Sequence, residues 1–116
     1  LISPDKDKGL TASMVNNYVK HGYLTKPDKK KYQRQQIARL IAITTLKSVF
    51  SIQEIAQTLN TLQTQASSDQ LYDAFVDYMN QGIDPANPII QTSCQTVKLY
   101  HQTLALIDHT QEEVIQ

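Results

Sequence analysis

The sequence predicts an all-α or nearly all-α protein with a single core. Apolar residues recur at helical spacing in five segments, and capping residues, glycine or proline separate these segments. The chain has 116 residues, which is near the commonest size of one domain. Hydrophobic residues make up 41% of the chain and charged residues 19%, which suits a core under a polar surface. We therefore expect one helical domain, or one with a helical extension.

The first expected helix runs from Thr11 to His21. The residues before it, Leu1 to Lys8, have little apolar content and are expected to be irregular. Thr11 is a good N-cap, and Gly22 is placed to end the helix. The next segment, Thr25 to Lys31, contains a Pro-Asp pair and four lysines. It is long enough only for a tight loop or a very short hairpin.

Two helices are expected in the middle of the chain. One runs from about Arg34 to Val49, and its apolar residues are spread widely enough to be buried on most sides. This helix would form the centre of the core. The run Ser51-Ile52-Gln53-Glu54 is a capping box, in which the serine and glutamate side chains each accept a bond from the other's backbone N–H. The next helix is therefore expected to begin there.

Two further helices complete the chain. Ser67-Ser68-Asp69-Gln70 offers another capped start, and Gly82 is the expected stop. After a turn with two prolines, a long helix is expected from about Pro88 to Thr110. Its apolar face contains Ile90, Cys94, Val97, Leu104 and Ile107. This face either pairs with a second chain in a homodimer or folds back on the preceding helix, and the short connecting loop favours the second arrangement.

The formal net charge of zero conceals a separation along the chain. Ten basic and three acidic residues up to Lys47 give +7, whereas one basic and eight acidic residues beyond it give −7. A distribution of this kind is typical of a protein with one half that faces a polyanion. We expect a basic unit at residues 1–66 and an acidic helical extension at residues 67–116, which packs on that unit or mediates dimerisation.

The sequence disfavours several classes of protein. It holds no nucleophile motif, no paired catalytic carboxylates and no phosphate-binding glycine loop, so we expect neither an enzyme nor a cofactor. Cys94 is the single cysteine, and with His101 it offers too few ligands for a metal site. No apolar stretch reaches the roughly 20 residues that a membrane span needs, and no signal peptide is visible. A cytoplasmic protein without membrane contact is expected.

Residues 9–24 read G-L-T-A-S-M-V-N-N-Y-V-K-H-G-Y-L. This run resembles, without a gap, the MerR-family segment G-V-S-x-x-T-L-R-x-Y-x-x-x-G-L-L, which in that family holds the recognition helix of a helix-turn-helix. Pro27, Tyr32 and the F-S-I-x-E-I run of residues 50–55 are similar to later positions of the same family. The resemblance implies a winged helix-turn-helix transcription regulator with a much reduced wing, followed by a two-helix C-terminal extension. The first helix of the motif would precede Gly9, and since the chain begins at Leu1 rather than Met we expect it upstream.

The chain is also similar to an uncharacterised bacterial family recorded only as a domain of unknown function. The shared runs are T-x-S-M-V-N-N-Y-V-K-x-G, K-K-Y and L-K-x-V-F-S-I, and this similarity extends over most of the chain. It implies a MerR-like regulator without naming an effector, so the similarity predicts a fold more than a function.

A recognition helix from Thr11 to His21 in the major groove of double-stranded DNA would divide its contacts in two. The expected base contacts are Ser13, Asn16 and Asn17, whose short side chains can hydrogen-bond to base edges. The expected phosphate contacts are Tyr18, Lys20, Lys26, Lys29, Lys30 and Lys31. If the unit does not bind DNA, these lysines are only a solvated basic face. The alternative function is a protein-interaction module on the same scaffold, which uses the acidic half or the shortened wing to hold a partner.

Overall fold

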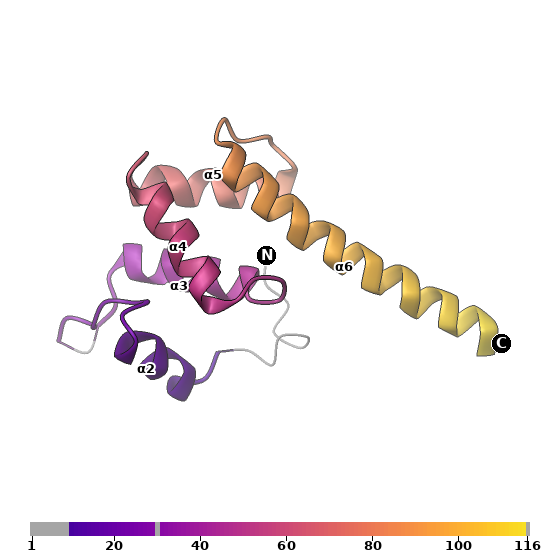
Figure 1. Ribbon diagram of the computed structural model, residues 1–116, viewed down its shortest axis with the longest axis horizontal. Helices are drawn as coiled ribbons and strands as arrows, with labels where there is room; N and C mark the ends of the chain where they lie inside the picture. Colours follow the sequence, from indigo (N-terminus) through magenta and orange to yellow (C-terminus); the bar gives the residue numbers. More distant parts are fainter. Residues whose placement is uncertain (1–9, 30, 116) are drawn as a thin grey trace.

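The computed structural model describes residues 10–29 and 31–115, with side chains up to residue 112, and it is helical throughout (Figure 1). The helices are α2 (Ala12–Lys20), α3 (Arg34–Leu46), α4 (Ile52–Gln63), α5 (Ser68–Gln81) and α6 (Pro88–Ile115). No strand occurs in these residues, and the one β-bridge joins Asp28 to Lys31. The all-α prediction is confirmed, and the segment between α2 and α3 is the tight loop that its length predicted.

The expected caps are present at four helix ends. Thr11 caps α2 by accepting a hydrogen bond from the backbone N–H of Met14. Ser51 and Ser67 begin α4 and α5 with complete capping boxes. Gly82 ends α5 with φ +69°, a left-handed conformation that glycine adopts without the steric cost of a Cβ. These boundaries depend on short sequence signals, and the sequence predicts them correctly.

The two helix ends without such a signal were misplaced. We expected the helix that starts at Arg34 to reach Val49, but α3 ends at Leu46. The backbone N–H groups of Val49 and Phe50 both donate to the Leu46 carbonyl, which makes a turn that leads to the cap of α4. The last helix, α6, continues past Thr110 to Ile115, because no glycine or proline interrupts it.

The C-terminal half of α3 lies at the centre of the core, where Ile43, Thr44, Thr45 and Leu46 are buried. Both threonine hydroxyls donate to carbonyls one turn earlier in α3, so that these polar groups are satisfied without a partner from another helix. The prediction that α3 would be buried on most sides was wrong for its first turns. Ile37 is 48% exposed, and Arg34 and Gln35 beside it are exposed as well.

Helix α6 packs on the body of the protein only through its first part. Ile90, Cys94 and Val97 are buried against α5 and α3. The Lys98 ammonium donates to the Tyr78 carbonyl at 2.9 Å and lies over the Tyr78 ring. From Leu99 to Glu112 every side chain is exposed, and this half projects away from the other helices (Figure 1). None of the described helices has the length and apolar character to cross a bilayer.

Candidate nucleic-acid interface

Helix α2 is amphipathic, with one face in the core and one in solvent. Its apolar residues Met14, Val15 and Val19 pack on the core cluster that contains buried Tyr18 and Leu24. Its polar residues occupy successive positions of one helix face, spaced three, four and seven apart. This exposed face consists of Ser13, Asn16, Asn17 and Lys20. All three expected base-contacting residues therefore lie together with one expected phosphate-contacting lysine, on a surface that the body of the protein does not cover.

A Schellman motif ends α2. The backbone N–H of Tyr23 donates to the Tyr18 carbonyl at 2.9 Å, and that of Gly22 donates to the Val19 carbonyl at 3.1 Å. Gly22 has φ +79°, which a residue with a side chain adopts only with strain. The motif reverses the chain sharply, so that Leu24 returns to the core with 3% of its surface exposed. The C-terminal end of α2 is thus anchored to the core.

Tyr18, which we expected to contact phosphate, belongs to the core. Only 9% of its surface is exposed, and burial raises the pKa of its phenol. Helix α2 ends two residues later, and the Tyr18 carbonyl accepts a hydrogen bond from the Tyr23 N–H. We therefore leave Tyr18 out of the candidate interface and assign it to packing.

The expected lysines of the loop between α2 and α3 are exposed where the structure describes them. Lys26, Lys29 and Lys31 all face solvent, whereas Lys30 lies outside the described residues. Asp28 and Lys31 exchange both backbone hydrogen bonds, at 2.9 Å and 2.8 Å, and Lys29 between them has φ +49°. The loop is therefore a minimal closed turn, and Figure 1 shows it next to α2, at the end of the protein away from the outer half of α6.

Two side chains of α3 that our sequence analysis missed hold this loop in place. The Gln36 amide donates to the Thr25 hydroxyl at 2.7 Å and to the Thr25 and Lys26 carbonyls at 3.0 Å and 2.8 Å. The Arg39 guanidinium donates through Nε to the Tyr23 carbonyl at 2.8 Å. Arg39 had one visible signal, since it is the charged residue that interrupts the apolar stretch from Ile37 to Ile43. Gln36 had no such signal, because it is one of many glutamines in the chain.

The charge around this region is predominantly positive. Asp28 is the only acidic residue among the described residues up to Lys47, and Glu54 and the aspartates of α5 come later in the chain. The Arg34 guanidinium lies 3.9 Å from the Asp69 carboxylate, and both side chains are largely exposed, so this ion pair contributes little to stability. The exposed lysines near α2 are left available to neutralise an anionic partner.

Cys94 and His101 lie in different surroundings. Cys94 is 1% exposed in the core, and burial raises the pKa of its thiol to about 11, so the thiolate form that binds metals is suppressed near neutral pH. His101 lies two turns further along α6, in solvent. Within the described part of the chain, no three metal-ligating side chains come together.

A protein family described as a domain of unknown function (DUF1836) matches residues 2–75. The chain belongs to this family. The matched segment holds α2, the lysine loop, α3, α4 and the first half of α5, so the candidate interface and the two side chains that support it lie within the family domain. Helix α6 lies outside the match. No curated protein and no solved structure is detectably similar to the chain.

Proposed function

We propose that the protein is a DNA-binding transcription regulator that inserts α2 into the major groove of double-stranded DNA. The observation that carries the proposal is the polar face of α2. Ser13, Asn16 and Asn17 are exposed on the same side of a helix whose opposite side is buried, which is the arrangement that a recognition helix requires. Asparagine can read adenine through two hydrogen bonds, and serine bonds to either donors or acceptors on base edges. A regulator of this kind acts in the cytoplasm.

The lysines supply the affinity that does not depend on sequence. Lys20 extends the polar face of α2, and Lys26, Lys29 and Lys31 are exposed in the neighbouring loop. Each lysine that neutralises a phosphate releases counterions, which makes binding strong at low salt and weak at high salt. Lys30 is included among these lysines because of its position in the sequence, between Lys29 and Lys31. In this assignment the loop acts as the reduced wing of a MerR-like winged helix.

We also propose that the outer half of α6 pairs two chains. Its exposed apolar residues Tyr100, Leu104 and Ile107 are spaced four and three apart and therefore form one stripe, 39% to 47% exposed. An exposed apolar stripe of this kind on a projecting helix is typical of an association surface. A symmetric dimer would present two copies of α2 to two half-sites of a palindromic operator.

Binding of the full chain to duplexes of about 30 base pairs, measured by fluorescence anisotropy between about 50 mM and 200 mM salt, tests the proposal. Replacing Lys29 and Lys31 together by alanine should weaken binding to every sequence and lower the salt slope by about 2, since each phosphate contact contributes about 0.9. Asn16→Ala and Asn17→Ala should instead change the preference among sequences. Selection from a random duplex pool supplies the preferred site.

Lys47→Ala is the matched control, because Lys47 follows the other end of α3, roughly 20 Å along the helix from the loop. It should leave the affinity and the salt slope nearly unchanged. An absence of affinity for every duplex at low salt would overturn the proposal and favour the protein-interaction module. Equal effects of Lys47→Ala and the loop variants would also contradict it, because the loop would then have no special role.

A further inference from the structure

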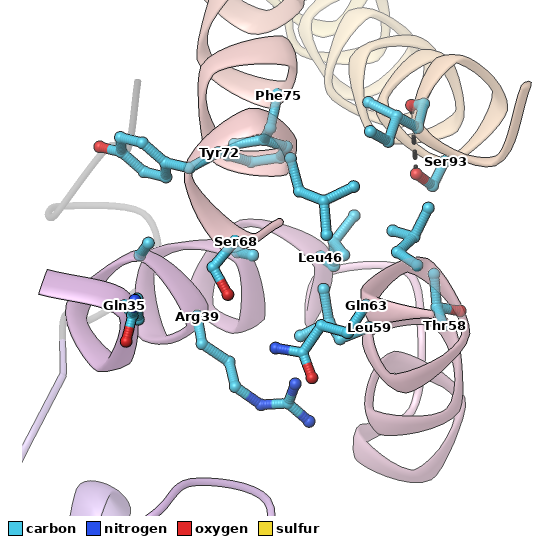
Figure 2. A pocket seen from close by; sticks show the side chains of 15 residues that line it. Gln35, Arg39, Leu46, Thr58, Leu59, Gln63, Ser68, Tyr72, Phe75 and Ser93 are labelled. Atoms are coloured by element: carbon cyan, nitrogen blue, oxygen red, sulfur yellow. Dashed lines mark hydrogen bonds between the residues drawn. The ribbon is translucent and has the colours of Figure 1, made fainter. Parts of the chain in front are cut away.

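A pocket lies between α3, α4, α5 and the first turns of α6, on residues that the proposed DNA contacts do not use (Figure 2). Its cavity volume is about 60 Å³, so it is a narrow slot, smaller than most small-molecule sites. The apolar part of its wall consists of Leu46, Leu59, Leu62, Leu71, Phe75 and Ile90. Because this volume is small, a fitting ligand is slim, such as an unbranched chain that lies along the slot.

The pocket also has a polar side, to which three helices contribute. Figure 2 shows the polar ends of Arg39 from α3, Gln63 from α4 and Ser68 from α5 on the same side of the space, with Leu46 and Phe75 elsewhere on the wall. Ser68 is the first residue of α5, so the positive end of that helix dipole points to this side as well. Thr58 and Ser93 lie elsewhere on the wall, but Arg39 is its one charged residue, so the slot matches a ligand with an apolar body and one anionic end.

Arg39 carries an uncompensated positive charge in this wall. Its side chain is partly buried, and burial lowers the pKa of its guanidinium. Its hydrogen-bond partners are neutral: Nε donates to the Tyr23 carbonyl at 2.8 Å, and a terminal nitrogen donates to the Asn60 side-chain oxygen at 3.0 Å. The described residues offer it no carboxylate, since their one ion pair joins Arg34 to Asp69. A guanidinium has five N–H donors, so Arg39 retains donors for an anion.

We propose that this pocket binds a slim apolar carboxylate, such as a medium-chain fatty acid, with the carboxylate on Arg39 and the chain along Leu62 and Phe75. The carboxylate supplies the charge that Arg39 lacks, and a charge-assisted bond in a partly desolvated site is stronger than a neutral one. The hydrocarbon chain removes apolar wall from water. A neutral ligand of the same length would bury the same apolar wall but would form no charge-assisted bond with Arg39.

Arg39 connects the pocket to the end of α2. The Tyr23 carbonyl that it holds belongs to the residue whose N–H closes the Schellman motif on Tyr18. A carboxylate that binds the remaining donors of Arg39 shifts the same guanidinium and so alters the anchor of the recognition helix. The ligand is accordingly an effector that changes DNA affinity, and this regulatory step rests on the proposed function, whereas binding in the pocket does not.

Calorimetric titration of the full chain with decanoate, decanol and decylammonium, each below its micelle concentration, tests the site. Decanoate should bind at least about tenfold more tightly than decanol, and decylammonium more weakly than both. Arg39→Gln should reduce decanoate affinity by about tenfold or more, while Arg34→Gln, on the exposed arginine of the same helix, leaves it unchanged. Ala42→Phe fills the wall of the pocket and should abolish binding of all three.

Equal affinity for decanoate and decanol, equal effects of the two arginine variants, or unchanged binding by Ala42→Phe would each overturn the site. If Arg39→Gln does not fold, the comparison of the three ligands on the unaltered chain still tests the site. Decanoate should also change duplex affinity in the unaltered chain and not in Arg39→Gln. If the chain binds decanoate but no duplex, the proposed function alone is overturned. If it binds duplex but not decanoate, the site alone is overturned. If it binds both and neither ligand changes the affinity for the other, the regulatory step is overturned.

Discussion

The Gln36 side chain joins the first turn of α3 to Thr25, with its amide nitrogen 2.7 Å from the Thr25 hydroxyl. The same amide nitrogen donates to two backbone carbonyls of the loop, and the amide oxygen accepts from the Gln33 N–H at the start of α3. One glutamine thus caps a helix and fixes the base of the lysine loop. The position of the loop relative to α2 depends on this contact and on the bond from Arg39 to the Tyr23 carbonyl.

Gln36→Ala should lower the free energy of unfolding by about 1–2 kcal/mol, because it removes several hydrogen bonds of which each contributes on the order of 1 kcal/mol or less when partly exposed. Urea denaturation followed by circular dichroism measures the change. Gln35→Ala is the control, since Gln35 is an exposed neighbour on the same helix. Equal destabilisation by both variants would show that the hydrogen bonds from Gln36 to the loop contribute nothing to stability.

Ile43→Ala should destabilise the protein by about 2–5 kcal/mol, because Ile43 is 1% exposed at the centre of the core and its loss leaves a cavity. Ile37→Ala, on the same helix but 48% exposed, should cost about 1 kcal/mol or less. The two variants remove the same atoms from the same helix, so the difference between their free energies of unfolding, measured by heat and by urea, reports the effect of burial alone. A similar cost at both positions would contradict the packing described for α3.

Gly82→Ala should cost about 1–2 kcal/mol, since the left-handed conformation at φ +69° disfavours a residue with a Cβ. The added methyl would meet no atom within 4 Å, so the cost is conformational rather than steric. Gly82→Asn should cost less, because asparagine tolerates this conformation better. Urea midpoints of the three chains check the order, and an alanine variant as stable as the natural chain would contradict it.

The Cys94 thiol should make stability fall as the solution becomes alkaline. Burial raises its pKa from the ordinary 9.0 to about 11, so below pH 9.0 the thiol is protonated in both states and contributes no pH dependence. Between these two values the unfolded chain ionises and the folded chain does not, which favours unfolding. The free energy of unfolding measured across this range should decline less steeply in Cys94→Ala. An equal decline in both chains would assign the effect to other groups, such as Tyr18.

Replacing Leu104 and Ile107 together by glutamate should shift the protein to monomers in sedimentation velocity, because the charges interrupt the exposed apolar stripe of α6. Gln95 and Gln102, on the opposite side of α6 and exposed, are the matched positions for a control with the same two added charges. This control should leave the oligomeric state unchanged. A natural chain that is monomeric at every concentration would overturn the proposed pairing.

The sequence predicted the features that depend on neighbouring residues. The caps at Thr11, Ser51 and Ser67 and the stop at Gly82 each require only a few adjacent side chains, and all four are present. The polar face of α2 follows from helical spacing, which needs only the helix itself. Periodicity also predicted the apolar face of α6, although it gave no means of telling its buried part from its exposed part.

The features that the sequence could not predict depend on contacts between distant residues. Gln36 and Arg39 reach backbone carbonyls 10 to 16 residues earlier in the chain, and no local pattern marks those carbonyls. The exposure of Ile37 depends on how the other helices pack around α3, which the periodicity of α3 itself does not reveal. The pocket is assembled from four helices, so its one charged wall residue is distinguished in the sequence only as an interruption of an apolar run.

The projecting half of α6 has a consequence for how much helix the protein contains. An isolated helix of about 15 residues is marginal in water, because propagation barely compensates for unfavourable nucleation and fraying. Here nucleation is provided by the packed turns from Ile90 to Val97, but the side chains from Leu99 to Glu112 are exposed, so packing on the body of the protein does not support the further turns. Association would add the missing tertiary contacts, so folding of this half and assembly become one equilibrium. The helical signal of the protein is therefore expected to rise with its concentration.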